Sequence, residues 1–169
     1  MKKVAIIGSG GAGKSTLARQ LSEKIGIPVY HLDAILWKPN WVMTSKTEQR
    51  MIQNELITRE SWIIDGNYGS TLDIRLNAAD TIIYLDLPRT VCLYRAIKRR
   101  FQYRNRTRPD MAADCKEKLD MEFLKWIWNY PKVKRPAILA MLKELSNEKN
   151  VIILSSRKEI KRFIENGDS

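Results

Sequence analysis

Cysteine and histidine are scarce in the sequence, and this scarcity excludes several kinds of site. Cys92 and Cys115 are the only cysteines among 169 residues, and neither has a His or Cys at ligand spacing. A disulfide framework and a structural zinc site are therefore excluded, whereas reduced cytosolic thiols fit the pattern. The single histidine, His31, ends an expected strand, and we interpret it as a packing or hydrogen-bonding residue.

Long hydrophobic runs and internal repeats are also missing. The amino-terminal stretch MKKVAIIGSGG begins like a signal peptide, but its apolar run, residues 4–7, is too short for export or for crossing a membrane. With 44% hydrophobic residues, a chain of this length has enough apolar surface for one globular core. We therefore expect one cytoplasmic domain over residues 1–169, without a membrane partner.

Positive charge is abundant and regional. The 30 Lys and Arg against 19 Asp and Glu give +11, and residues 89–135 hold 14 of the basic residues against 5 acidic ones, a local +9. This asymmetry favours an anionic, phosphate-rich partner, with a solvated basic surface as the alternative. Small polyphosphates and nucleic acids are both polyanions, so charge alone does not distinguish them.

Short β-rich runs alternate with longer segments of helical periodicity, which is typical of a parallel sheet wrapped by helices. Expected strands lie in KVAIIG (3–8), PVYHL (28–32), WIIDG (62–66), DTIIYLDL (80–87) and NVIIL (150–154), whose consecutive apolar residues suit burial on both faces. Residues 101–130 break the alternation with a polar, proline-punctuated loop and the helical pattern EKLDMEFLKWIWNY. We expect a lid and helical insertion there, beside an α/β sheet.

Residues 8–15 read GSGGAGKS and match the phosphate-binding pattern G-x-x-x-x-G-K-[ST], between an expected strand and an expected helix. Glycine backbones allow successive N–H groups to surround a phosphate, and the helix start adds the positive end of its dipole. Lys14 would bridge the β- and γ-phosphates, and the Ser15 hydroxyl would be a Mg²⁺ ligand. The expected nucleotide-binding residues are Gly8, Ser9, Gly10, Gly11, Ala12, Gly13, Lys14, Ser15 and Thr16.

ATP is the expected nucleotide. P-loops serve GTPases, motor ATPases and small-molecule kinases, so the loop alone does not define the reaction. A GTPase would carry a guanine-reading N-K-x-D tetrad on a late strand, and the late strand here continues into SSRKE instead. This difference argues against GTP.

Two longer segments resemble the adenylate-kinase-related phosphotransferases. They are WIIDGN, at the end of a strand, and YLDLPRTVCLYRAIKRR, a strand followed by a proline and an arginine-bearing helix. With YHLDAILWKPNW, DGNY and TRPD added, nearly the whole chain is similar to the bacterial DNA topology modulation proteins, which group with those kinases. The resemblance implies a three-layer P-loop fold of the nucleotide and shikimate kinase type, with a five-stranded parallel sheet in the order 2-3-1-4-5. It also implies ATP and Mg²⁺ as cofactors.

Arg95 and Arg99 are candidates for a catalytic clamp. They lie four residues apart on an expected helix, so both guanidinium groups project from one face and can grip one polyphosphate. Fixed cations there would stabilise the charge that spreads over the γ-phosphoryl group during transfer. In the resembling kinases, arginines at the matching positions contact nucleotide phosphates. The alternative is a pair of solvated arginines on an exposed helix.

Two carboxylates follow expected strands. Asp65 precedes Gly66 at the carboxyl edge of the sheet, where the P-loop also lies. The resemblance implies that Asp65 organises Mg²⁺, with a turn-forming aspartate as the alternative. Asp33 follows PVYHL, and we interpret it as a catalytic residue that binds the acceptor hydroxyl or acts as general base; helix capping is the alternative.

The segment after Asp65 departs from adenylate kinase. NYGST follows the Asp-Gly pair where that family has Pro-Arg, so the arginine that contacts the acceptor phosphate is missing. Arg75 is a candidate replacement. Trp37 and Trp41 are candidates for the wall of an acceptor pocket or, alternatively, for the core.

These features predict transfer of the ATP γ-phosphoryl group to a small acceptor: a nucleoside, a nucleotide or another hydroxyl-bearing metabolite. The alternative is an ATP-dependent, DNA-associated protein that modulates DNA topology, in which aromatic side chains stack on bases and arginines contact phosphates. Its candidate contacts are Phe101, Tyr103, Trp126, Trp128 and Tyr130, with Arg104, Arg106 and Arg108.

A buried stripe competes with the DNA interpretation. Apolar residues recur at helical spacing through the insertion, which predicts packing against the body of the protein and leaves Trp128 off the stripe. The stripe consists of Leu119, Phe123, Trp126 and Tyr130. No helix-turn-helix, zinc-finger or RNA-recognition pattern is present, and 169 residues leave no room for a second motor domain.

Overall fold

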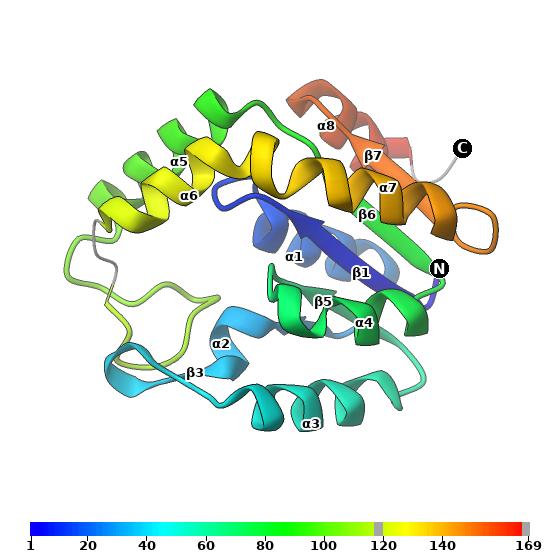
Figure 1. Ribbon diagram of the computed structural model, residues 1–169, viewed down its shortest axis with the longest axis horizontal. Helices are drawn as coiled ribbons and strands as arrows, with labels where there is room; N and C mark the ends of the chain where they lie inside the picture. The colour runs from blue at the N-terminus through cyan, green and yellow to red at the C-terminus, as the bar shows by residue number, and fades with distance from the viewer. Residues whose placement is uncertain (117–119, 167–169) are drawn as a thin grey trace.

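The computed structural model describes residues 1–116 and 120–166, and a five-stranded parallel sheet forms its centre (Figure 1). The strands of this sheet are β1 (Lys3–Gly8), β2 (Val29–His31), β5 (Trp62–Asp65), β6 (Thr81–Leu85) and β7 (Asn150–Leu154). Their order is β2-β5-β1-β6-β7, which is 2-3-1-4-5 when only these five strands are numbered, and every pairing is parallel. The α/β fold class and the strand order expected from the sequence are therefore confirmed.

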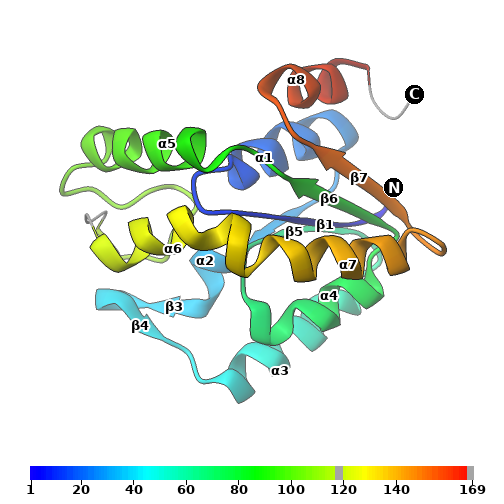
Figure 2. The same cartoon turned by 45° about the horizontal axis from the view of Figure 1, so that its top comes forward.

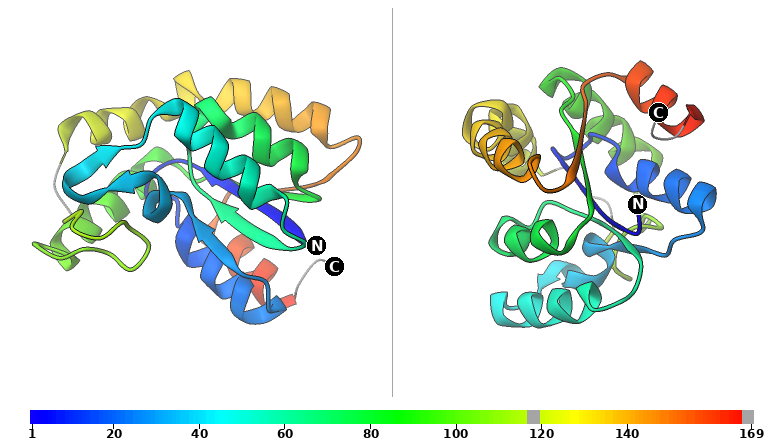
Figure 3. Two further views of the ribbon diagram at one scale, coloured as in Figure 1. Left: turned by 90° about the horizontal axis from the view of Figure 1, so that it is seen from below. Right: turned by 90° about the vertical axis from the view of Figure 1, so that its right-hand side faces the viewer.

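Helices cover both faces of the sheet and complete a three-layer arrangement (Figures 2 and 3). One face is covered by α1 (Lys14–Ile25), α5 (Arg89–Gln102) and α8 (Arg157–Asn166), and the other by α3 (Lys46–Ile57), α4 (Leu72–Ala78) and α7 (Arg135–Leu145). Alternate residues of β1 belong to the two cores, with Ile6 on the α1 side and Ile7 on the α3 side. No helix in the described ranges is long and apolar enough to cross a membrane.

Several short elements at the carboxyl edge of the sheet were not predicted. Helix α2 (Leu32–Leu36) follows β2 directly and leads into a hairpin of β3 (Trp37–Lys38) and β4 (Val42–Met43). One-turn 3₁₀ helices cover Pro39–Trp41 and Gly69–Thr71. Such short elements contain too few residues for a periodic pattern, so turn geometry and tertiary contacts form them.

The helical part of the insertion, α6 (Met121–Val133), extends past Tyr130 and is followed at once by α7. The first residues of the expected helix, 117–119, and with them Leu119 of the stripe, lie outside the described residues. The rest of the stripe is confirmed, since Phe123 stacks on Trp126 with 5.9 Å between ring centroids and Trp126 meets Tyr130 edge-on at 5.3 Å. Trp128, off the stripe, is 44% exposed.

The loop between α5 and α6 lies against the β3–β4 hairpin, and we call its residues 103–116 the lid loop (Figure 1). Met111, Ala112 and Cys115 of the lid loop form a small core with Trp37 and Trp41. The Trp41 Nε1 group also donates a hydrogen bond to the Lys116 carbonyl at 3.1 Å. Two segments far apart in the sequence thereby close one side of the carboxyl edge.

Candidate active site

The loop between β1 and α1 has the geometry of a phosphate-binding loop. Gly11 and Gly13 adopt left-handed backbone angles, with φ of 74° and 97°. A Cβ atom on Gly11 would lie 2.1 Å from the Cys92 carbonyl oxygen of α5, so only glycine fits between the loop and that helix. Helix α1 begins at Lys14, as predicted, and its first N–H groups have no partner within the helix. This arrangement can bind a phosphate group.

Lys14 extends along the loop that precedes it. Its Nζ donates hydrogen bonds to the carbonyl oxygens of Gly8, at 3.1 Å, and Ser9, at 2.9 Å. Burial lowers the pKa of Lys14, while the negative charges of Asp33 and Asp65 act in the opposite direction. The loop carbonyls therefore hold the ammonium group between the P-loop and two carboxylates.

Ser15, Asp65 and His31 form a hydrogen-bonded series. Ser15 Oγ donates to Asp65 Oδ2 at 2.7 Å, and His31 Nδ1 lies 2.6 Å from Asp65 Oδ1. Asp65 ends β5, which lies between β1 and β2, and only 4% of it is exposed. Burial alone would lower the pKa of His31, but the hydrogen bond and charge of Asp65 raise it overall. The hydrogen-bonding interpretation of His31 is thus confirmed, and Asp65 is held beside the P-loop.

Arg95 and Arg99 of α5 both line the cleft that contains the P-loop. Arg95 Nη1 donates to the Ala12 carbonyl at 3.0 Å. Burial and the charge of Arg157, at the start of α8, lower the pKa of Arg95. The pKa of Lys14 is lowered mainly by burial and, to a smaller extent, by the charge of Arg99. Cations brought this close repel one another, so their convergence favours an anion bound among them.

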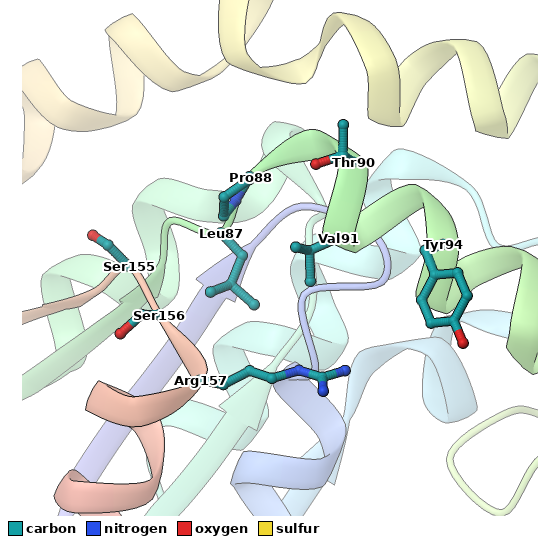
Figure 4. Close-up of a pocket in the computed structure, with 8 residues that line it drawn as sticks. All are labelled: Leu87, Pro88, Thr90, Val91, Tyr94, Ser155, Ser156 and Arg157. Carbon is teal, nitrogen blue, oxygen red and sulfur yellow. The ribbon is translucent and has the colours of Figure 1, made fainter.

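A hollow of about 580 Å³ adjoins this cleft between the start of α5 and the start of α8 (Figure 4). Leu87, Pro88 and Val91 give it an apolar wall on the α5 side. Tyr94 and Arg157 line both the hollow and the main cleft, so the two spaces are neighbours. Figure 4 shows the Arg157 side chain extending beneath Val91 toward Tyr94.

The main cleft, about 740 Å³ in volume, extends from the P-loop to α2 and the lid loop. Asp33, in the first turn of α2, accepts a hydrogen bond from Tyr68 Oη at 2.7 Å. Burial and the charge of Asp33 raise the pKa of Tyr68, while the neighbouring Trp37 side chain lowers it slightly. His31, not Asp33, occupies the N-cap position of α2, which excludes the capping interpretation of Asp33.

The lid loop adds the carboxylate of Asp110 to the main cleft. Arg108 Nη1 lies 3.3 Å from Asp110 Oδ2, and both side chains are largely buried. Burial would raise the pKa of Asp110, but the charge of Arg108 and the interaction with the Ser15 side chain lower it overall. The lid loop thus brings an ionised carboxylate to the P-loop.

Arg75 does not take the acceptor-phosphate role considered for it. The side chain is fully buried, with 0% exposure. Its guanidinium group donates to the carbonyls of Gly66 at 3.0 Å and Tyr68 at 3.3 Å, and to Gln53 Oε1 at 3.1 Å. Arg75 therefore stabilises the turn after β5, and the acceptor-facing interpretation was wrong.

Among the residues that line the cleft and that sequence reasoning missed are Tyr68, Asp110 and Arg157. Each lies in a quoted segment, namely DGNY, TRPD or SSRKE, that was interpreted without assigning the residue a place in the site. The usable signal for Tyr68 and Arg157 was position, because both follow the carboxyl end of a parallel strand, where ligands of open α/β sheets bind. Asp110 had no such signal, since the lid loop is placed by contacts with a distant hairpin.

Comparisons with known proteins give one similar sequence. No protein-family model matches the chain. The uncharacterized protein YqaC of Bacillus subtilis (strain 168) is 28% identical over 130 residues, which cover 74% of this chain and 70% of YqaC.

Three solved kinase structures are similar in fold. The shikimate kinase from Acinetobacter baumannii in complex with shikimate has a TM-score of 0.62 and 15% identity, covering 98% of this chain and 89% of that chain. A sugar kinase from Janibacter sp. HTCC2649 has a TM-score of 0.51 and 19% identity, covering 98% and 91%. The deoxyadenosine kinase from M. mycoides, with products dCMP and dCDP bound, has a TM-score of 0.51 and 16% identity, covering 96% and 94%.

These likenesses confirm a P-loop kinase-like fold for this chain. The finer resemblance to the DNA topology modulation proteins stays a prediction.

Proposed function

We propose that the protein is an ATP-dependent phosphotransferase that passes the γ-phosphoryl group to a hydroxyl group of a small acceptor. The observation that carries this proposal is the convergence of the P-loop, Arg95, Arg99 and Asp33 on one cleft of about 740 Å³. A phosphate loop alone would also serve simple hydrolysis. Here the cleft continues beyond the loop to a carboxylate that can accept a proton, as transfer to an alcohol requires.

The nucleotide would lie between the P-loop and α5. Backbone N–H groups of residues 8–16 would hold its phosphates, and Lys14 would neutralise charge on the transferred group. Arg95 already donates a hydrogen bond to the Ala12 carbonyl. Burial is the main cause that lowers the pKa of Lys14, and Arg99 lies close enough for its charge to lower this pKa further. Both guanidinium groups would therefore face the phosphoryl group during transfer.

The hollow of Figure 4 would take the nucleotide base. It shares Tyr94 and Arg157 with the phosphate-binding part of the cleft. Its apolar wall suits one side of a flat ring, and the Arg157 guanidinium can stack on the other. The phosphates on the P-loop and the base in the hollow account for one continuous ligand.

Ser15 and Asp65 have the chemistry of a Mg²⁺ site. A hydroxyl and a carboxylate oxygen already lie 2.7 Å apart beside the P-loop, and hard oxygen donors are the ligands that Mg²⁺ prefers. No group of three or more His, Cys, Asp or Glu side chains in the described residues is arranged to hold a metal. That finding fits an ion held by few protein ligands together with substrate phosphates. A bound Mg²⁺ would neutralise charge on the β- and γ-phosphates.

Asp33 would act on the acceptor. The acceptor hydroxyl oxygen attacks the γ-phosphorus, the bond between that phosphorus and the bridging oxygen of ADP breaks, and Asp33 accepts the hydroxyl proton. Tyr68 holds one oxygen of Asp33, at 2.7 Å, which fixes the carboxylate for this step. The products are ADP and a phosphate ester.

The DNA-associated alternative has less support among the aromatic side chains. Trp126 and Tyr130 pack in the stripe of α6, and Tyr130 is buried. Trp128 lies under the Arg89 guanidinium, 3.9 Å from its carbon to the ring centroid. Phe101, 73% exposed, is the best-placed candidate for stacking on a base. The charge of +11 by itself gives salt-sensitive DNA binding without specificity.

Replacement of Lys14 with Ala tests the proposal. We expect Lys14→Ala to lose ATP turnover by at least about 100-fold, because the charge on the transferred group loses a fixed cation. Lys161→Ala, on the exposed side of α8, is the matched control and should keep wild-type turnover. Unchanged melting temperatures in both variants would separate the catalytic effect from folding. Full activity of Lys14→Ala would contradict the P-loop assignment.

A further inference from the structure

The end of the main cleft beside α2 and the lid loop differs in composition from the end beside α5. We call it the acceptor end. Its lining residues include Asp33, Trp37, Trp41, Tyr68, Arg108 and Asp110. Three aromatic rings face two carboxylates and one guanidinium group there, so the formal charge of these six side chains is negative. The end beside α5, by contrast, is dominated by arginine and lysine.

Two arginines near the acceptor end, Arg108 and Arg75, already have partners, whereas Arg19 of α1 lines the main cleft on the side of His31. Arg108 is paired with Asp110 at 3.3 Å and contacts Met111 Sδ at 3.6 Å. Arg75, which would have been the replacement for the missing phosphate-binding arginine, is fully buried against backbone carbonyls. A second phosphate group on an acceptor that lies between the indoles and Asp33 would therefore face Asp33 and Asp110, and like charges at close range disfavour binding.

The two indoles of the acceptor end form a fixed wall. Trp37 and Trp41 are 5.5 Å apart between ring centroids, with an interplanar angle of 74°. Asn40 and Trp41 both have left-handed backbone angles, with φ of 60° and 62°. Bulky residues rarely adopt this conformation, which persists where the surroundings impose it. Packing against Met111 and the hydrogen bond to the Lys116 carbonyl hold Trp41 there.

The same wall is connected to the proposed base. Trp37 and Tyr68 both line this end of the cleft, and the Tyr68 hydroxyl donates to Asp33 Oδ1 at 2.7 Å. The Asp33 carboxylate is thereby oriented by the side chain that also lines the acceptor end. An acceptor that lies against the indoles would have its hydroxyl group placed next to Asp33.

We infer that the acceptor is an alcohol that carries a flat unsaturated ring and no phosphate or carboxylate group. The inference rests on the phosphotransferase function proposed above and narrows its substrate. The ring lies against Trp37 and Trp41, and the hydroxyl group faces Asp33. Nucleosides and aromatic vitamins of the pyridoxine type share this chemistry.

A product screen tests the inference. Purified protein, ATP and Mg²⁺ are combined with adenosine, cytidine or pyridoxine, with their phosphate esters AMP, CMP and pyridoxine phosphate, and with glucose or shikimate. Phosphorylated products are measured by mass spectrometry. We expect at least one flat-ring alcohol to be phosphorylated, with kcat/KM at least about 100-fold above that of its phosphate ester, because like charges repel at the acceptor end. The nucleoside and pyridoxine arms distinguish the two sources of the ring.

Variants of the wall test the position of the ring. Trp41→Ala should raise the KM for the acceptor by about tenfold or more while the KM for ATP stays unchanged. Trp41→Phe keeps a flat ring, so its KM for the acceptor should lie between the values of wild type and Trp41→Ala. This variant controls for damage to the hairpin. Trp128→Ala, on the outside of α6, should behave as wild type.

The outcomes separate this inference from the proposed function. A phosphate ester, glucose or shikimate as the preferred acceptor overturns the inference and leaves the phosphotransferase intact. An acceptor KM that is unchanged in Trp41→Ala overturns the placement of the ring. Hydrolysis of ATP without any phosphorylated compound in the screen contradicts both proposals.

Discussion

At the residue scale, the hydroxyl group of Tyr68 determines how Asp33 is held. Tyr68→Phe removes the 2.7 Å hydrogen bond to Asp33 but keeps the ring in the wall of the cleft. We expect kcat to fall about tenfold with the KM for ATP unchanged, because a base held less firmly is aligned less often. Tyr30→Phe is a matched control, because it removes the hydrogen bond that Arg59 donates to the hydroxyl group of Tyr30 on the edge strand β2. Steady-state kinetics showing equal kcat for both variants would contradict the positioning role.

Asp80 links the amino terminus to the start of β6 and makes stability depend on pH. Its carboxylate accepts hydrogen bonds from the N–H groups of Lys2, at 2.7 Å, and Lys3, at 2.8 Å. Burial would raise the pKa of Asp80, but the hydrogen bonds from Thr81 and from these N–H groups lower it overall. A lowered pKa contributes stability above the unfolded value of about 3.9, and this contribution is lost as pH falls through the folded pKa.

Asp80→Asn should therefore make the free energy of unfolding depend less on pH in the acid range. We expect the difference in free energy of unfolding between wild type and Asp80→Asn to be constant above about pH 5 and to shrink below pH 4. Urea titrations at several pH values measure this difference. A difference that does not change with pH would show that the Asp80 charge is not coupled to folding.

The residues of the candidate site that could be placed individually from the sequence were those within a motif of defined chemistry. Lys14, Ser15 and Asp65 lie together because a P-loop and a strand-terminal carboxylate meet at the same edge of a parallel sheet. Arg75 was misinterpreted because nothing in the local sequence shows that its guanidinium group turns inward to backbone carbonyls. Side-chain direction depends on tertiary contacts, which a single segment does not contain.

At the element scale, the contact between the P-loop and α5 requires glycine at position 11. Gly11→Ala would bring Cβ to 2.1 Å from the Cys92 carbonyl, in addition to the strain of a φ of 74°. Gly26→Ala, at a φ of 70° with no atom within 4 Å of the new Cβ, isolates the strain alone. We expect Gly26→Ala to lower the free energy of unfolding by about 1 kcal/mol. Gly11→Ala should lower it by at least about 2 kcal/mol more, as measured by denaturant unfolding. Equal losses would contradict close packing of the loop on α5.

We expect the face of α5 that points toward the P-loop to contribute to the turnover of ATP. Replacing Arg95 and Arg99 together with Ala should lower kcat for ATP by at least about 100-fold, because two cations beside the phosphoryl group are lost. The matched control is the double replacement of Arg104 and Arg106, two exposed arginines of the lid loop. Unchanged kinetics in the Arg95 and Arg99 variant would refute the clamp. A larger loss in the control would move the functional arginines to the lid loop.

The long elements were predictable and the short ones were not. Strands of four to six residues with apolar side chains on both faces, such as β1, β5 and β6, gave a clear signal. Helix α2 and the β3–β4 hairpin gave no such signal, although α2 contains Asp33, β3 contains Trp37 and the turn of the hairpin contains Trp41. These segments fold where they do because the lid loop packs on them, and that contact is non-local.

At the scale of the whole molecule, the parallel sheet explains why the candidate site is in one place. Residues from β1, β2 and β5 meet at one edge because all three strands run in the same direction, and α6 lies beside that edge. The expected location of the candidate site followed from the sequence for this reason, whereas the strand order was implied by the resemblance to the kinases. The composition of the acceptor end did not, since it depends on the contact between the hairpin and the lid loop.

The central claim is transfer of a phosphoryl group rather than hydrolysis, and isotope labelling in ¹⁸O-water tests it most directly. Hydrolysis of ATP incorporates one ¹⁸O atom into inorganic phosphate, whereas transfer produces an unlabelled phosphate ester. We predict an unlabelled ester formed in step with ADP by the wild-type protein, and its loss in Lys14→Ala, as measured by mass spectrometry. Release of all the phosphate as labelled inorganic phosphate, at a rate raised by DNA, would contradict the account.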